Sequence, residues 1–407
     1  GYGALSATTT ASFNTAVGKS SLGSNTTGAN NTAVGKSALS ANTTGYSNVS
    51  VGVNAAGATT VGFSNIAMGH GALFTNIDGS RSVAIGTSAL YTQEPASAVS
   101  MYNTAVGHDA GKLITTGAQN TLIGGLAGDA ITTGANNTAV GYASLDANTT
   151  GADNVAVGKN ALTANTTAAH NVGIGADSLE SNTTGTANTA VGTTALGANT
   201  TASNNTAVGR SALGANTTGT TLTAVGASAL AANTTGIRNV AIGNNSLDSN
   251  TTGQLNVGVG FNTLQSNTTG NQNTGLGDNA LATNTTGANN IAIGYVSSDA
   301  NTTGDQNVSV GVGSLQSNTT ADNNTAVGYQ ALNTNTTGTE NVALGKDALK
   351  DSTTGSYNTA VGTLANENNT TGHSNTVVGR AAMNENTTGT QNVAIGRSAL
   401  LANTTAS

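Results

Sequence analysis

Residues 31–47 read NTAVGKSALSANTTGYS, and this pattern recurs every 17 residues along the chain. If Asn31 is numbered column 1 and Ser47 column 17, the glycine that closes NTAVG always falls in column 5. Successive column-5 glycines are 17 residues apart everywhere except between Gly86 and Gly107, where the interval is 21. A fixed period of this kind is typical of stacked repeats, in which each repeat forms one turn of a solenoid.

Columns 2 to 4 predict a short β-strand in every turn. In 32–34 and its equivalents, β-branched or aliphatic residues alternate with a small one, which is the period of a strand. We expect columns 2 and 4 to point into the turn together with the leucine of column 9, because these are the larger apolar residues. The predicted core ladder comprises Val34, Leu39, Val140, Leu145, Val208 and Leu213.

Two groups of residues predict the bends between strands. Glycine in column 5 permits positive φ, and the Asn-Thr-Thr-Gly of columns 12 to 15 has the composition of a tight turn. Asparagines stacked in one column also exchange side-chain hydrogen bonds along the stacking axis. The predicted turn ladder comprises Asn31, Gly35, Asn42, Gly45, Asn205, Gly209, Asn216 and Gly219. The fold class that follows is all-β, a parallel β-solenoid (β-roll) with 17-residue turns.

The repeat is expected to extend over the whole chain. The column-5 glycines predict one continuous rod of about 24 turns across residues 1–407. Residues 53–134 are irregular, and a four-residue insertion lies within 91–102 (YTQEPASAVSMY). Gly111 and Gly128 replace the column-9 leucine there, and Leu113 and Leu126 are expected to stand in for it. Because the chain starts and stops within a repeat, we interpret it as a fragment of a longer polypeptide.

Column 3 is small in nearly every repeat and is expected to face away from the core. A slender turn buries little apolar surface. At about 25 cal/mol per Å², the free energy gained from this burial barely offsets the conformational entropy lost when the residues of the turn become ordered. Association of several chains would bury a second face of each turn. We therefore expect the column-3 alanines at close chain-to-chain or sheet-to-sheet contacts, so that Ala207→Leu should disrupt assembly more than Arg210→Leu.

The composition excludes several classes of protein. The chain has 11 basic and 18 acidic residues and no basic stripe, so nucleic-acid binding is not expected. It contains no cysteine, which removes disulfides and thiolate metal sites. The sequence contains no run of about 18 apolar residues, so no membrane span is predicted. The four histidines lie in variable columns of different turns, namely His70, His108, His170 and His373.

No catalytic, cofactor-binding or metal-binding residue is predicted from these patterns. The histidines lack metal-ligand spacing, and the short glycine-rich strings lack the Lys-Ser/Thr partner of a phosphate loop. The chain is therefore not expected to be an enzyme or to need a cofactor.

Two stretches carry a family resemblance. SVAIGTSAL (82–90) and NVAIGRSAL (392–400) resemble the head repeats of trimeric autotransporter adhesins, the YadA-like left-handed parallel β-roll. The tandem NTAVGxxALxxNTTG units also resemble the shaft repeats of phage tail fibres. The adhesin head repeat is shorter and lacks the NTTG extension. The resemblance implies a homotrimeric extracellular fibre on a cell or virion surface, and no catalytic residues belong to the motif.

Four functions follow from these patterns, one of which is direct adhesion along the rod through the Tyr and Lys/Arg residues that follow each column-5 glycine, with many weak contacts acting together. The other three are the following. The first is a structural fibre or stalk that spaces or presents an adhesive tip, with other copies of the chain as its main partners and a host-surface receptor or glycan as a further one. The second is a self-assembling extracellular filament that grows end to end. The third is a single-chain ice-binding solenoid that uses the threonines of columns 13 and 14, although adjacent strand residues face opposite ways and present only one file.

The variable columns indicate what the fibre exposes. Column 6, directly after the column-5 glycine, holds most of the basic residues and many aromatics, and its candidate contact residues are Lys36, Tyr142, Arg210, Tyr295 and Tyr329. The NTT triplet is also a glycosylation sequon. A structural turn is the preferred interpretation of that triplet, and N-glycosylation is the alternative, at residues such as Asn25, Asn216 and Asn267.

Overall fold

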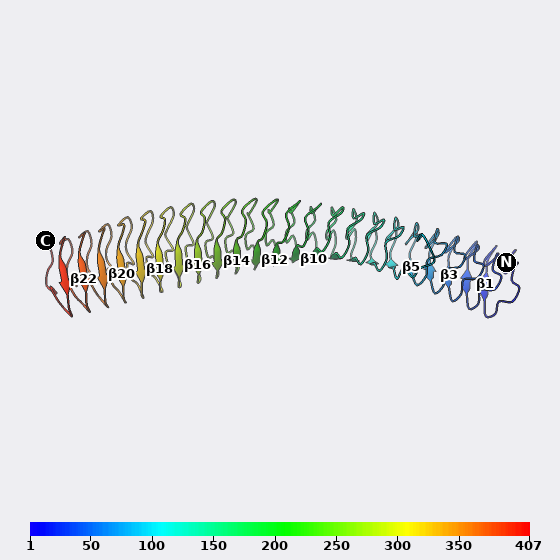
Figure 1. Cartoon of the computed structure of the whole chain (residues 1–407), viewed down its shortest axis with the longest axis horizontal. Helices are drawn as coiled ribbons and strands as arrows, with labels where there is room; N and C mark the ends of the chain where they lie inside the picture. The colour runs from blue at the N-terminus through cyan, green and yellow to red at the C-terminus, as the bar shows by residue number, and fades with distance from the viewer. The chain divides into compact units, whose positions relative to one another are not determined.

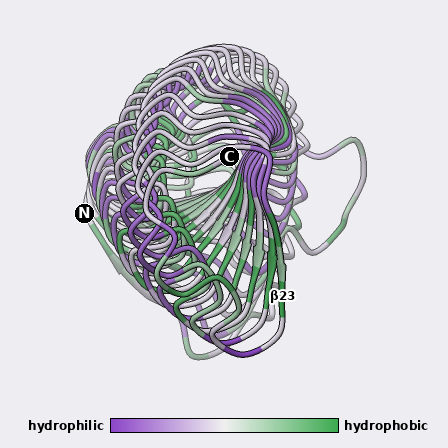
Figure 2. Cartoon of the chain, turned by 90° about the vertical axis from the view of Figure 1, so that its left-hand side faces the viewer, coloured by the Kyte–Doolittle hydropathy of each residue, from purple (hydrophilic) through white to green (hydrophobic).

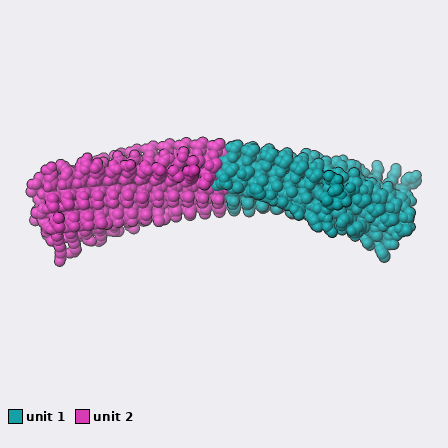
Figure 3. Space-filling view, viewed as in Figure 1, with its two compact units in different colours: residues 1–204 teal, residues 205–407 magenta.

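The computed structural model describes residues 1–407 and divides them into two compact units, Gly1–Asn204 and Asn205–Ser407 (Figure 3). Each unit is a parallel β-solenoid that contains no helix. Every strand is three residues long and occupies columns 2 to 4 of its repeat (Figure 1). The predicted all-β parallel solenoid with a 17-residue period is therefore confirmed.

The first unit contains β1 (Thr15–Val17), β2 (Thr32–Val34), β3 (Val49–Val51), β4 (Ile66–Met68), β5 (Val83–Ile85), β6 (Thr104–Val106), β7 (Thr121–Ile123), β8 (Thr138–Val140), β9 (Val155–Val157), β10 (Val172–Ile174) and β11 (Thr189–Val191). The second contains β12 (Thr206–Val208), β13 (Thr223–Val225), β14 (Val240–Ile242), β15 (Val257–Val259), β16 (Thr274–Leu276), β17 (Ile291–Ile293), β18 (Val308–Val310), β19 (Thr325–Val327), β20 (Val342–Leu344), β21 (Thr359–Val361), β22 (Thr376–Val378) and β23 (Val393–Ile395).

Within each unit, neighbouring strands pair in parallel and in register, so each residue lies beside the same column of the next turn. In β2 and β3, Ala33 pairs with Ser50. The same register holds between β5 and β6, where Val83 pairs with Thr104 although 21 residues separate them. The four inserted residues are therefore accommodated outside the strand ladder.

The structure reverses the predicted faces of the strand. Ala33 is fully buried, whereas Val34 is 36% exposed and Val208 is 37% exposed, and Val140 is half-buried. Columns 2 and 4 point outward, and column 3 points into the turn. The prediction that Val34, Val140 and Val208 form a core ladder is wrong. Ala207 is also fully buried, so the predicted position of column 3 at chain-to-chain contacts is wrong as well.

Side-chain volume explains this orientation. The column-9 leucines Leu39, Leu145 and Leu213 are fully buried. Each such leucine packs against column 3 of the following turn. Gly258, for example, is the column-3 residue that follows Leu247, and a Cβ at Gly258 would lie 3.5 Å from Leu247 Cδ1. The narrow interior accepts a leucine from one side only if the strand contributes a small residue from the other. Column 3 is small because it faces the core.

The irregular region obeys the same rule of complementary size. Gly111 occupies column 9, and a Cβ there would lie 2.6 Å from Cδ1 of Leu122, the large column-3 residue of the next turn. Ile114 and Ile131 replace the column-12 asparagine and are fully buried. These isoleucines and Leu122 fill the space that the missing leucines leave. The expectation that Leu113 does so is wrong, because it is 43% exposed.

Leu126, the other residue expected to replace a core leucine, lies in column 7 and is half-buried, with φ of 60°. It is not fully buried, so it does not take the place of a core leucine, and that expectation is wrong as well.

The column-5 glycines are required by the stacking of the turns. Gly35 has a φ of 136°, and a Cβ on it would collide with the backbone carbonyl of Gly52 in the next turn. Only glycine combines that conformation with so close a backbone approach. Gly209 has a φ of 138° and fills the same position in the second unit.

Candidate interaction surfaces

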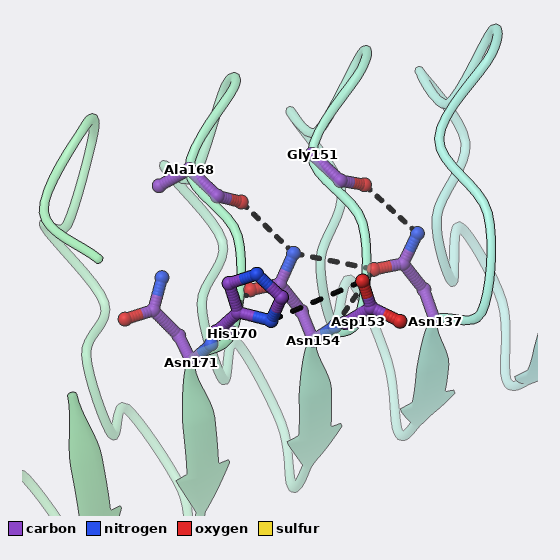
Figure 4. Close-up of polar contacts among 7 residues, drawn as sticks. All are labelled: Asn137, Gly151, Asp153, Asn154, Ala168, His170 and Asn171. Atoms are coloured by element: carbon purple, nitrogen blue, oxygen red, sulfur yellow. Dashed lines mark hydrogen bonds and ion pairs between the residues drawn. The ribbon is translucent and has the colours of Figure 1, made fainter. Parts of the chain in front are cut away.

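The column-1 asparagines form a ladder that ties each turn to its neighbours (Figure 4). Asn154 Nδ2 donates to the carbonyl oxygen of Ala168 at 2.9 Å and to Asn137 Oδ1 at 3.2 Å. The backbone N–H of Asn171 in turn donates to Asn154 Oδ1 at 3.0 Å. One side chain therefore closes its own turn and holds both adjacent turns, which makes column 1 structural rather than available for binding.

The predicted turn-ladder residues take the same positions in both units. Asn31 Nδ2 donates to Gly45 O at 2.9 Å, and Asn205 Nδ2 donates to Gly219 O at 2.9 Å. Residues of column 12 form a second, buried ladder. Its hydrogen bonds run from Asn42 Nδ2 to Asn25 Oδ1 at 2.7 Å and to Gly45 O at 3.0 Å, and from Asn216 Nδ2 to Gly219 O at 3.0 Å.

The second ladder is incompatible with the proposed N-glycosylation. Asn25, Asn216 and Asn267 are all fully buried. Asn267 Nδ2 donates to Asn250 Oδ1 at 2.8 Å and to Gly270 O at 3.0 Å, so both amide hydrogens are used inside the fold. A sugar on that nitrogen would remove one of these bonds and has no space. The alternative interpretation of the NTT sequons is therefore wrong for the folded chain.

The outward face of the strands carries no charge, and its column-4 row is apolar. Column 4 is aliphatic in all 23 strands, and column 2 is always threonine, valine or isoleucine. The strand segments accordingly appear as hydrophobic green when the chain is viewed along its length (Figure 2). Exposed side chains on this sheet face include Ile66, Met68, Ile123, Ile174, Val225, Ile242, Leu276, Ile293 and Leu344.

Column 6 borders the sheet face and is exposed in most turns. Its predicted contact residues all reach solvent, namely Lys36, Tyr142, Arg210, Tyr295 and Tyr329. The chemistry of this column varies from turn to turn and includes the carboxylate of Asp278. Lys346 lies 5.9 Å from the centroid of the Tyr329 ring, which is within range of a cation–π contact.

A side-chain cluster in columns 16 and 17 was not predicted from the sequence. Tyr46 and Phe63 stack with ring centroids 4.9 Å apart and an interplanar angle of 4°. The guanidinium of Arg81 lies over Phe63 at 5.2 Å and over Tyr102 at 5.6 Å. Arg81 Nη1 also donates to Ser100 Oγ at 2.7 Å and to Tyr102 Oη at 3.0 Å. Aromatic residues in one column of successive turns were the available signal.

The titratable groups are spread along the surface. His170 Nδ1 lies 3.9 Å from Asp153 Oδ2 on the neighbouring turn (Figure 4), and His108 Nδ1 lies 3.5 Å from Asp109 Oδ2. The structure contains no group of three or more metal-ligating side chains. Burial raises the pKa of the Asp129 carboxyl, with further contributions from neighbouring carboxylates.

No helix capable of crossing a membrane is present in the chain. In a comparison with known proteins, no protein-family model and no curated protein matches the sequence.

Proposed function

We propose that this chain is a shaft segment of a self-associating extracellular fibre, a homotrimeric stalk that spaces an adhesive tip from a cell or virion surface. The observation that carries the proposal is the uncharged sheet face of columns 2 and 4, whose column-4 row is aliphatic in every strand. The resemblance of 82–90 and 392–400 to trimeric adhesin repeats supports three as the number of chains and the extracellular location.

A comparison of two exposed columns supports self-association through the sheet face. Column 6 accepts lysine, arginine, tyrosine and aspartate, as expected for residues that meet only water. Column 4 lies two residues away and is exposed or half-buried in every strand, but it is aliphatic throughout. If column 4 had only to favour a β-strand, threonine would be accepted there, because column 2 of the same strands contains it. A second apolar surface packed against column 4 explains the restriction.

The dimensions of the sheet face also support a partner. Strands β12 to β23 present two rows of side chains about 50 Å long, at about 4.8 Å per turn, with the rows about 7 Å apart. Monomeric soluble proteins seldom expose contiguous apolar patches of more than a few hundred Å². Three copies related by a threefold axis would turn this face of each chain toward the other two.

The proposal is tested by placing charge on the sheet face. Val225→Lys with Ile242→Lys adds two cations to column 4, and Ala227→Lys with Asn244→Lys adds two to column 6 of the same turns as the matched control. Sedimentation velocity should give a smaller particle for the column-4 variant and an unchanged particle for the control. Equal behaviour of the two variants would contradict association through columns 2 and 4. A mass that grows without limit with concentration would favour the end-to-end filament.

The same face provides the one observation that favours ice binding. Columns 13 and 14 do not form a two-file array, because the column-13 hydroxyls bond to the backbone of the next turn, as Thr26 Oγ1 does to Thr43 O at 3.0 Å. Columns 2 and 4 do form two regular outward files. Thermal hysteresis of the purified chain tests this second candidate, and its absence at millimolar concentration would remove it.

A further inference from the structure

The four-residue insertion leaves the solenoid as a loop between β5 and β6. Residues 96–99 are all exposed, and no other stretch of four consecutive exposed residues occurs between residues 15 and 390. In the regular turns of this range, by contrast, no more than two consecutive residues are exposed. The loop is thus the one internal place where several adjacent peptide groups face solvent together.

The backbone of this loop is free of hydrogen bonds. Residues 95–98 neither donate nor accept a backbone hydrogen bond. The ladder stops at the amide of Glu94, which donates to Thr115 O at 3.0 Å, and resumes at the carbonyl of Val99, which accepts from Ser80 N at 3.0 Å. An endopeptidase must bind its substrate strand in an extended form, and exposed loop tips of small residues are where chains are preferentially cut.

The composition of the loop selects the kind of enzyme. Residues 95–99 read PASAV and contain no basic or aromatic side chain. The nearest such residues, Tyr91 and Tyr102, stack on neighbouring aromatic or guanidinium groups of the adjacent turns. A protease with a small S1 pocket would accept alanine or valine here, whereas one that requires lysine, arginine or a large ring would not.

We propose that residues 96–99 are a proteolytic processing site for an endopeptidase that cleaves after small aliphatic residues. Water adds across one peptide bond, one product chain ends in a carboxylate, and the other begins with an amine. The proposal concerns the loop alone and is independent of whether the fibre associates through its sheet face.

The surrounding contacts hold both new chain ends in place. On the amino-terminal side, Gln93 is fully buried and its amide donates to Asn76 Oδ1 at 3.1 Å. On the carboxyl-terminal side, Arg81 holds Ser100 and Tyr102 by hydrogen bonds and by stacking. Strands β5 and β6 remain paired across the cut. The cleaved protein should therefore stay one particle with two non-covalently joined chains.

Limited digestion of the full chain with pancreatic elastase tests the site, with trypsin and chymotrypsin as specificity controls. Elastase should give two fragments whose intact masses place the cut within 96–99, and the native particle should keep its size by gel filtration until denaturant is added. Trypsin and chymotrypsin at equal activity should leave the chain intact. A variant that lacks residues 95–98, in which the spacing returns to 17, should resist elastase while melting at or above the original temperature.

Three results would overturn the proposal: first cleavage by elastase elsewhere in the repeats, survival of the chain where an unfolded control is digested, or equal cutting of the deletion variant. Separation of the fragments without denaturant would overturn the inference that the flanking contacts hold the ends.

Discussion

At the scale of single residues, the fold depends on left-handed backbone at residues that are not glycine. Columns 7, 9 and 17 adopt positive φ in nearly every turn, for example 55° at Ser37, 50° at Leu39 and 56° at Ser47. Asparagine and aspartate tolerate this region best, and β-branched residues tolerate it poorly. Val296, with φ of 48° in column 7, is therefore a strained position.

Val296→Asn should stabilise the protein by about 1 kcal/mol, because it relieves the β-branched strain without burying a new group. The matched reverse change is Asn279→Val, one turn earlier at φ of 56°, which should destabilise by a similar amount. Urea denaturation followed by circular dichroism measures both. Opposite signs are expected, and a loss of stability in both variants would show that the conformation carries no strain.

Asn366 is a second residue whose environment predicts its effect. It occupies column 9 in place of leucine, is fully buried, and neither its Oδ1 nor its Nδ2 has a hydrogen-bond partner. Column 3 of the next turn is Val377, which is larger than the usual alanine, so the pair keeps the total volume. Asn366→Leu combined with Val377→Ala should stabilise by roughly 1–3 kcal/mol, since it removes an unsatisfied amide.

The two changes at 366 and 377 should couple. Asn366→Leu alone overfills the site and Val377→Ala alone leaves a cavity, so the double variant should exceed the sum of the single ones by about 0.5–3 kcal/mol. Thermal melts of the four proteins complete the cycle. Simple additivity would contradict the packing of column 9 against column 3 of the following turn.

At the scale of the element, each turn is held by the column-1 asparagine more than by its three-residue strand. Replacing Asn154 with alanine leaves the Ala168 carbonyl and the Asn171 amide without their partners. The expected loss of stability is roughly 2–6 kcal/mol, because each of the two orphaned buried groups costs about 1–3 kcal/mol. Thr150→Ala, at an exposed position of the same region, should change stability by less than about 0.5 kcal/mol. Hydrogen exchange should show the increase in opening centred on β8 to β10.

The sequence predicted the element correctly but not its orientation. Period, strand and turn positions follow from glycine and asparagine, whose backbone requirements are local. Which side of Thr32–Val34 faces inward depends on the volume left by Leu39 and its equivalents, and hydrophobicity alone favours the wrong answer. The cluster around Arg81 was not foreseeable in full, because the path of the inserted loop decides that Ser100 and Tyr102 meet the guanidinium.

At the scale of the whole molecule, half-buried carboxylates predict an unusual pH dependence. Burial raises the pKa of Asp129, Asp146, Asp248 and Asp299. An acid whose pKa is higher in the folded chain binds protons preferentially there. Its charged form therefore destabilises the folded chain fully above the raised pKa. This destabilisation disappears as the pH falls toward the ordinary pKa of about 4. These four groups should therefore make the protein more stable as the pH falls from 7 toward 4.

The fourfold Asp→Asn variant at these positions tests that sign. Its melting temperature at pH 7 should exceed that of the unaltered chain by about 1–3 °C, a small gain because the groups are partly solvated. Its stability should also vary less between pH 4 and pH 7. A stability that rises with pH in this window, with no difference between the two proteins, would refute the assignment.

We propose that the outward face of columns 2 and 4 is the interface between copies of the chain. The most direct test is the mass of the unaltered protein in solution by multi-angle light scattering. Trimer formation through columns 2 and 4 predicts three times the 39.4 kDa chain mass, independent of concentration above the dissociation range. A particle of 39.4 kDa at micromolar concentration, with the apolar face left in water, would contradict it.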